Sequence, residues 1–346
     1  MEDLASLQLS LTMPMRFAGL VLENTNRCTA KCGMCYQSAG PKGSDVLGKA
    51  HLDRDVMKRV IREARSVPTL SPRFHLAGGE AFMAMPECLD LYRTARDAGY
   101  LDITGTTNAF WARSEAAARD IVTELRGAGV TSLEISWDYW HMPWIKPAAI
   151  GLAIEACYDA DIETNLRILT TKSHDVDEAL AAIPRDQLAL VSRMTSGPVF
   201  ATGRAAETID PADFHDCGGG LTGACHSTLN LTINSFGNVF PCCAGFDQTN
   251  GYLFGNVKEE SIVDIADRIN NDPIARLIVF RGISKLLAIL ERQSISIGGN
   301  AKGICELCWT IFSSAEAVAA IRSHSAEVQE RALMRIAQSL ELIDAG

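Results

Sequence analysis

Apolar runs alternate with amphipathic stretches from about residue 16 to residue 196. The apolar runs predict strands at 17–24, 73–80, 101–108, 132–138, 163–171 and 188–195. The stretches between them carry apolar residues at helical spacing and predict helices at 52–66, 86–99, 114–129, 147–160 and 176–183. Such alternation is typical of parallel strands with helical crossovers, and six units favour a barrel over a flat sheet. We therefore expect an α/β fold with a partial, TIM-like (β/α)6 barrel.

The pattern changes after residue 197, where loop residues become frequent. Residues 228–243 alternate on both sides of the turn "NSFGN" and predict a β-hairpin. Helices are expected at 261–271, around 274–292 and from about 305 to 340. The expected organisation is an N-terminal segment (1–15), the barrel (16–200), a hairpin-plus-helical extension (201–312) and a C-terminal helix (313–346).

Composition and charge exclude several classes of partner. The chain has 346 residues, 47 % of them hydrophobic, and a formal net charge of −10. A general nucleic-acid or anionic-membrane binder needs a basic face, which this balance argues against. The longest apolar runs, such as 286–290, are too short to cross a bilayer, and the first residues do not resemble a signal peptide. We expect a cytoplasmic protein without nucleic-acid or membrane partners.

Eleven cysteines, an odd number in a large chain, do not indicate a disulfide framework. Cys88 and Cys157 stand alone in predicted helices, as small buried hydrophobic residues do. The other nine form two groups: Cys28, Cys32 and Cys35 near the N-terminus, and Cys217, Cys225, Cys242, Cys243, Cys305 and Cys308 in the last third.

The first group has the chemistry of an incomplete metal site. Three close thiolates suit a soft metal, but structural zinc sites close with four protein ligands. A [4Fe–4S] cluster is also normally held by four thiolates, so three leave one iron open to a substrate or cofactor. The group follows the first predicted strand and therefore lies at the C-terminal mouth of the barrel, where active sites of parallel barrels form. Zinc and chance remain the alternatives.

The segment "CTAKCGMC" (28–35) resembles the C-x3-C-x2-C motif of the radical S-adenosylmethionine (SAM) superfamily. The resemblance implies that the open iron binds the methionine moiety of SAM. Reduction, by a donor such as flavodoxin or ferredoxin, would then yield a 5′-deoxyadenosyl radical that takes a hydrogen atom from the substrate. Met34 stands where the family often has an aromatic residue, and it is expected to pack near the adenine.

Further strand ends resemble SAM-binding motifs of the same family. They are "AGGE" after the second strand, "TTNAF" after the third, "ISWD" after the fourth and "TNLRI" in the fifth. The alternative for each is an ordinary capped strand end or surface pair. The implied cofactor-binding residues are Gly78, Gly79, Glu80, Asn108, Ser136, Asp138, Asn165 and Arg167. In "DYWHMPW" (138–144), Asp138 and His141 are the candidate catalytic residues, although a structural histidine is the common alternative.

The second cysteine group resembles the C-terminal iron–sulfur extension called SPASM, or its shorter relative, twitch. Six thiols cannot provide eight ligands, so we expect one auxiliary [4Fe–4S] cluster held by Cys225, Cys242, Cys305 and Cys308. Cys243 is an alternative to Cys242, Cys217 is a spare, and zinc suits the same four thiols. Four thiolates would close the site and favour a role as electron acceptor.

The resemblance implies an enzyme that oxidises or crosslinks its substrate after hydrogen abstraction. Maturation of a ribosomally made peptide is the preferred function, and dehydrogenation or epimerisation of an aminocyclitol or sugar is the alternative. A non-catalytic iron–sulfur or zinc protein is the alternative of another class. Only 27 residues precede Cys28, so a peptide substrate is expected to need a separate recognition protein or direct docking.

Overall fold

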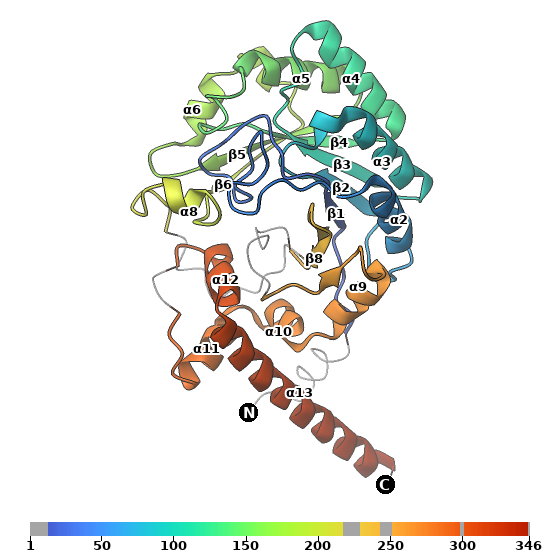
Figure 1. The fold of residues 1–346 in the computed structure, drawn as a ribbon, viewed down its shortest axis with the longest axis vertical. Helices are drawn as coiled ribbons and strands as arrows, with labels where there is room; N and C mark the ends of the chain where they lie inside the picture. The colour runs from blue at the N-terminus through green and yellow to red at the C-terminus, as the bar shows by residue number, and fades with distance from the viewer. Residues whose placement is uncertain (1–12, 217–228, 243–250, 298–300, 345–346) are drawn as a thin grey trace.

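The computed structural model of the chain describes residues 13–216, 229–242, 251–297 and 301–344. Its centre is a curved, nine-stranded sheet in the order β6-β5-β4-β3-β2-β1-β7-β8-β9, with helices on the outer face (Figure 1). All neighbours from β1 to β6 pair in parallel, as the alternating pattern predicts. The bounds of these strands are Leu20–Glu23 (β1), Arg73–Ala77 (β2), Asp102–Thr107 (β3), Ser132–Ser136 (β4), Glu163–Thr170 (β5) and Arg193–Pro198 (β6).

Amphipathic helices cover the outer face because each places one apolar stripe on the sheet. In α2 (Arg54–Ala64), the buried side chains fall at positions 57, 60, 61 and 64, which is the spacing of one helix face. Asp53 caps this helix by accepting the backbone N–H groups of Asp55 and Val56. The other crossover elements are η1 (Ala81–Ala84), α3 (Met85–Asp97), α4 (Glu115–Ala128), α5 (Pro147–Asp159), α6 (Val176–Ala181) and α7 (Arg185–Leu188).

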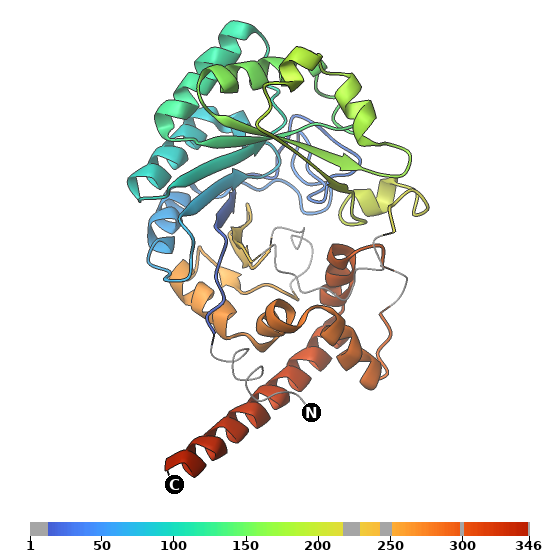
Figure 2. The ribbon, with the colours of Figure 1, turned by 180° about the vertical axis from the view of Figure 1, so that it is seen from behind.

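The extension continues the sheet of the barrel. The predicted hairpin consists of β7 (Leu231–Ile233) and β8 (Asn238–Phe240), and β9 (Gly255–Asn256) adds a further short strand. β7 pairs in parallel with the edge strand β1, with Leu20 opposite Leu231. The hairpin thus covers an edge that a partial barrel would leave open, and a covered edge cannot pair with other chains. Figure 2 shows this junction from behind.

Three predicted elements differ in detail from the structure. The strand expected at 188–195 begins only at Arg193, because α7 takes Leu188. The helix expected around 274–292 is two helices, α10 (Pro273–Arg281) and α11 (Ser284–Arg292), separated by Gly282 at φ 83°. The helix expected from about 305 to 340 breaks at Ser314, which is extended, into α12 (Ile304–Ser313) and α13 (Ala315–Asp344). Apolar spacing persists across such breaks, so periodicity alone does not detect them.

The remaining helices are α8 (Ala205–Thr208), which follows β6, and α9 (Ile262–Asn271), which packs on α2. Figure 1 shows α13 extending away from the rest of the molecule. Within the described ranges, no single helix is long and apolar enough to cross a membrane. Only α12 and the first part of α13 meet that criterion as a pair, across a bend of 95°.

Candidate active site at the barrel mouth

A pocket opens at the C-terminal ends of the parallel strands. Its wall combines the loop after β1 with the residues that end β2, β3 and β4, which parallel pairing brings to one rim. Nine of the residues predicted from sequence line it: Cys28, Cys32, Met34, Cys35, Gly79, Glu80, Asn108, Ser136 and His141. The fold therefore gathers into one cavity motifs that lie up to 113 positions apart in the chain, from Cys28 to His141.

The sulfur atoms of this pocket act as hydrogen-bond acceptors. The backbone N–H of Ala30 lies 3.3 Å from the Sγ of Cys28, and that of Ala39 lies 3.4 Å from the Sγ of Cys35. Burial raises the pKa of the Cys28 thiol and of the Cys35 thiol, so a coordinating metal is what would deprotonate them. Amide donors to sulfur are among the groups that tune iron–sulfur clusters. The donor set therefore fits such a cluster.

The described residues hold no group of three or more His, Cys, Asp or Glu side chains gathered around one metal ion. A [4Fe–4S] cluster does not require that convergence, because each thiolate binds a different iron. Cys28, Cys32 and Cys35 all line the pocket, and none of them is in a disulfide. Their assignment as cluster ligands remains a prediction from the motif.

The turn after β2 needs glycine because its backbone lies very close to the backbone of the segment before the cysteine loop. Gly78 has φ 144°, and a Cβ on Gly79 would lie 2.2 Å from the carbonyl oxygen of Arg27. The N–H groups of Gly79 and Glu80 donate to the carbonyls of Thr25 and Arg27, both at 2.7 Å. The turn thus abuts the start of the cysteine loop. The family resemblance predicts SAM at this position, and the structure shows a further reason for the glycines within the chain itself.

Glu80 links the turn after β2 to the end of β3. Its carboxylate accepts the hydroxyl of Thr107 at 2.9 Å and the backbone N–H of Asn108 at 2.7 Å. Burial raises the pKa of Glu80 to about 7, although these hydrogen bonds and His141 oppose the shift. The side chain therefore orders the rim of the pocket.

The Asn108 side chain points towards the cysteine loop. Its Nδ2 donates to the hydroxyl of Thr29 at 3.1 Å and lies 3.7 Å from the Sγ of Cys28. The next residue, Ala109, has φ 57°, a left-handed conformation that turns the chain sharply away from the strand. Asn108 is thus placed against one predicted cluster ligand, and its contact with SAM remains a prediction.

Asp138 and His141 form a buried pair at the edge of the pocket. The Nδ1 of His141 lies 2.8 Å from Oδ1 of Asp138, which also accepts the backbone N–H of Trp140 at 3.1 Å. Burial lowers the pKa of His141, but Asp138 and Cys32 raise it, and the net pKa is well above the ordinary value. His141 lines the pocket, whereas Asp138 lies outside its lining and orients the imidazole.

Asn165, Arg167 and Gly78 do not belong to the pocket lining. The amide of Asn165 donates to Glu134 at 3.1 Å and accepts the hydroxyl of Thr195 at 3.1 Å. It therefore joins a polar row across β4, β5 and β6 inside the barrel. The expected contacts of Asn165 and Arg167 with SAM remain predictions.

The auxiliary cysteines are described in part. Cys242 follows β8, and Cys305 and Cys308 lie one turn apart on α12, where residues three apart share a helix face. All three are half-buried. Cys217, Cys225 and Cys243 lie outside the described residues, so the expected fourth ligand and the alternatives to Cys242 are not placed.

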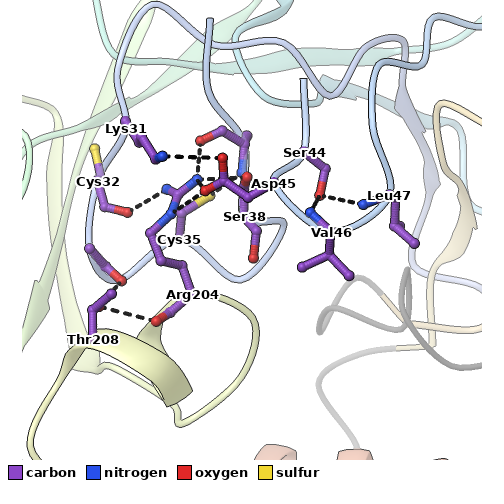
Figure 3. Close-up of polar contacts among 12 residues, drawn as sticks. Lys31, Cys32, Cys35, Ser38, Ser44, Asp45, Val46, Leu47, Arg204 and Thr208 are labelled. Atoms are coloured by element: carbon purple, nitrogen blue, oxygen red, sulfur yellow. Dashed lines mark hydrogen bonds and ion pairs between the residues drawn. The ribbon is translucent and has the colours of Figure 1, made fainter. Parts of the chain in front are cut away.

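One residue of the site escaped the sequence analysis. Arg204, just before α8, inserts its guanidinium beneath the loop that carries Cys32 and Cys35 (Figure 3). The short stretch "TGRAA" around it shows no periodicity or metal-binding spacing. Apart from Asp45, its partners are backbone carbonyls, which leave no trace in a sequence.

Known proteins share this architecture. The "Putative peptide biosynthesis protein YydG" of Bacillus subtilis (strain 168) is 20 % identical over 312 residues, which cover 85 % of this chain and 91 % of that protein. The solved structure "Native anSMEcpe with bound AdoMet" has a TM-score of 0.56 at 15 % identity, covering 93 % of this chain and 99 % of that one. The same protein "with bound AdoMet and Cp18Cys peptide" has a TM-score of 0.53 at 14 % identity, covering 94 % and 100 %. At this identity, the structural similarities show a shared fold.

Family models match both halves of the chain. The model of the radical SAM superfamily matches residues 22–183, which include the first cysteine group. The model of SPASM, an iron–sulfur cluster-binding domain, matches residues 225–309, from Cys225 past Cys308. The two domain types bind SAM with a [4Fe–4S] cluster and further iron–sulfur clusters, respectively. The chain therefore carries a radical SAM domain followed by a SPASM-type iron–sulfur extension.

Proposed function

We propose that this protein is a radical SAM enzyme that oxidises or crosslinks a ribosomally made peptide. The observation that carries the proposal is the shared pocket, in which Cys28, Cys32 and Cys35 face Gly79, Asn108 and Ser136. With the cluster and SAM bound there, reductive cleavage of SAM supplies a 5′-deoxyadenosyl radical. Cys28, Cys32 and Cys35 would supply the thiolates that hold the cluster. Glu80 orders the rim of the pocket, and His141 lines the pocket in which the substrate would react.

Oxidation of the substrate requires the removal of a second electron. After losing a hydrogen atom to the radical, the substrate would release a proton to solvent and pass one electron to the extension. We propose that Cys242, Cys305 and Cys308, with Cys225, hold the auxiliary cluster that accepts this electron. Cys242 follows β8, which belongs to the same sheet as the strands that end at the pocket, and Cys308 packs against the same hydrophobic core as Cys242, which supports this role.

A peptide is the favoured substrate because two related proteins point to one. YydG is described as a peptide biosynthesis protein, and anSMEcpe has been solved with a bound peptide. A sugar or aminocyclitol is the competing substrate class. We further propose a separate peptide-recognition protein and a flavodoxin or ferredoxin as partners.

The test has two stages. First, the anaerobically reconstituted protein is given dithionite and SAM, and 5′-deoxyadenosine is measured by chromatography. We expect product, and its absence would contradict radical SAM activity. Second, short peptides encoded beside the gene are offered in deuterated form. Transfer of deuterium into 5′-deoxyadenosine supports the peptide assignment, and transfer only from labelled aminocyclitols would contradict it.

A further inference from the structure

Arg204 is a buried cation whose partners all belong to the cysteine loop and its continuation. Only 5 % of the residue is exposed. Its guanidinium donates to the carbonyl oxygens of Cys32 at 2.8 Å, Ser38 at 2.6 Å and Ala39 at 2.7 Å. Nε and Nη2 also donate to Oδ2 of Asp45, at 3.1 and 2.7 Å. Figure 3 shows the guanidinium enclosed by these acceptors.

The backbone around Arg204 holds the same loop from the same side. The N–H of Arg204 donates to the carbonyl of Cys35 at 3.0 Å, and the hydroxyl of Thr208 donates to the carbonyl of Gly33 at 3.0 Å. The approach is close, because a Cβ on Gly203 would lie 2.0 Å from the carbonyl oxygen of Tyr36. The segment after β6 therefore binds the cysteine loop through the carbonyls of five residues between Cys32 and Ala39.

The cysteine loop is built from turns. Residues 28–39 contain neither a helix nor a strand, and the carbonyls of Cys32 and Ser38 accept the backbone N–H groups of Cys35 at 3.2 Å and of Asp45 at 3.0 Å. Arg204 adds a charged donor to these two carbonyls and to that of Ala39, so its removal takes three charge-assisted hydrogen bonds from the loop. The planar guanidinium presents donors from Nε, Nη1 and Nη2 to these acceptors, a geometry that the single ammonium nitrogen of lysine cannot reproduce.

The positive charge of Arg204 is balanced by the carboxylate of Asp45. Asp45 accepts its ion pair at 2.7 Å and also pairs with Lys31 at 3.2 Å, and its side chain is 44 % exposed. A buried positive charge beside a cluster favours the reduced state, which carries one more negative charge. Asp45 opposes that effect, so substitutions of Arg204 and Asp45 should move a reduction potential in opposite directions.

We propose that Arg204 is a positioning residue for the SAM-binding cluster: it holds the loop 32–39 so that Cys32 and Cys35 are presented as ligands, and its charge, balanced by Asp45, sets the cluster's reduction potential. The proposal rests on the cluster assignment made under the proposed function. Through Arg204, the segment that connects the barrel to the extension is hydrogen-bonded directly to the cysteine loop.

The test compares four variants with the parent after anaerobic reconstitution. Arg204→Gln removes the positive charge and most of the guanidinium's hydrogen-bond donors. Arg204→Lys keeps the positive charge but loses the guanidinium geometry. Asp45→Asn keeps the guanidinium and removes the negative charge of its ion-pair partner. Arg126→Gln is the control. Arg126 is an exposed cation on α4 that pairs with Asp161, and it does not line the pocket. The readouts are the rate of iron loss to a chelator and the midpoint potential of the EPR signal that changes when SAM is added.

We expect both Arg204 variants to lose iron about tenfold faster, since about 1.4 kcal/mol of loop stabilisation is a factor of ten. The potential should become more negative in Arg204→Gln, stay near that of the parent in Arg204→Lys and become more positive in Asp45→Asn. Arg126→Gln should match the parent. If circular dichroism shows that Arg204→Gln is unfolded, the other two variants decide the matter.

Two results would overturn the inference while leaving the proposed function intact. One is parental iron retention in the Arg204 variants. The other is a potential in Asp45→Asn that equals that of the parent or moves in the negative direction. A parent protein whose EPR signal never responds to SAM contradicts the proposed function itself, and the inference falls with it.

Discussion

The carboxylate of Glu80 accepts the backbone N–H of Asn108 at 2.7 Å and thereby ties the end of β2 to the end of β3. Asn108 in turn donates to Thr29 at 3.1 Å, in the cysteine loop. Three loops that lie far apart in sequence are thus joined at the rim of one pocket by two hydrogen bonds.

Removing the Glu80 carboxylate should loosen this rim. In Glu80→Ala, the N–H of Asn108 and the hydroxyl of Thr107 lose their acceptor, at a cost of about 1–3 kcal/mol each when buried. We expect a lower melting temperature and weaker SAM binding by titration. Glu80→Gln retains an acceptor and should lie between the alanine variant and the parent. Equal SAM affinity in all three proteins would show that the rim does not shape the site.

A methyl group on Gly79 should not be tolerated. It would meet the Arg27 carbonyl oxygen at 2.2 Å and push the glycine turn away from the cysteine loop. We expect Gly79→Ala to reduce both the melting temperature and the iron content. Gly127→Ala is the matched control, because Gly127 lies inside α4 with open space around a Cβ and should gain about 0.5–1 kcal/mol. Normal iron retention in Gly79→Ala would contradict the prediction.

His75 should make stability fall on mild acidification. Its ring nitrogens contact the hydroxyls of Thr104 at 2.7 Å and Thr106 at 2.9 Å, and burial lowers the pKa of His75 to about 4. Since the folded pKa lies below the ordinary 6.5, its contribution is complete above pH 6.5 and is lost as the pH falls towards 4. Between pH 7.5 and 6 the parent should lose about 1 kcal/mol more than His75→Gln in thermal unfolding.

His51 supplies a control of opposite sign for this measurement. The hydrogen bond to Glu87 raises the pKa of His51, so its contribution is present below the ordinary pKa and is lost as the pH rises through the folded one. The pH dependence of His51→Gln relative to the parent should therefore run the other way. Identical pH dependence in the His75 variant and the parent would refute the buried-histidine prediction.

Asp138 and His141 should act as one unit. The carboxylate orients the imidazole at 2.8 Å, and only the imidazole lines the pocket. We expect Asp138→Asn and His141→Gln each to slow substrate turnover about tenfold, and the double variant to be little worse than either, as for coupled groups. The measurement is turnover at saturating SAM. Multiplicative losses in the double variant would mean that the two residues work independently.

The two cysteine groups should separate SAM cleavage from substrate oxidation. Replacing Cys28, Cys32 and Cys35 by alanine should remove about four irons per chain and abolish 5′-deoxyadenosine formation, while the other cluster is kept. Replacing Cys305 and Cys308 should spare SAM cleavage and stop turnover of the true substrate. Unchanged turnover in the second variant would argue against an electron-accepting role for the extension.

The sequence by itself determined the order of elements and the chemistry of the pocket. Strand and helix periodicities arise from local side-chain patterns, and parallel pairing then sends every strand end to the same rim. That is why "AGGE", "TTNAF" and "ISWD", read only as strand ends after a cysteine triplet, contribute Gly79, Asn108 and Ser136 to one cavity. The thiol spacing carried the family resemblance because metal ligation restricts residue type and separation.

Tertiary structure alone decided the contacts made by backbone carbonyls and by distant edges. Nothing in "LNLTI" indicated that β7 would pair with β1, since strands pair through backbone groups and the sequence of a strand does not specify its neighbour. The hydrogen bond from Arg204 to Cys32 likewise uses a backbone carbonyl oxygen. Every residue has such an oxygen, so the sequence does not show which one will be bound. Local patterns set what each segment can form, and close packing between segments far apart in the chain selects which polar groups meet.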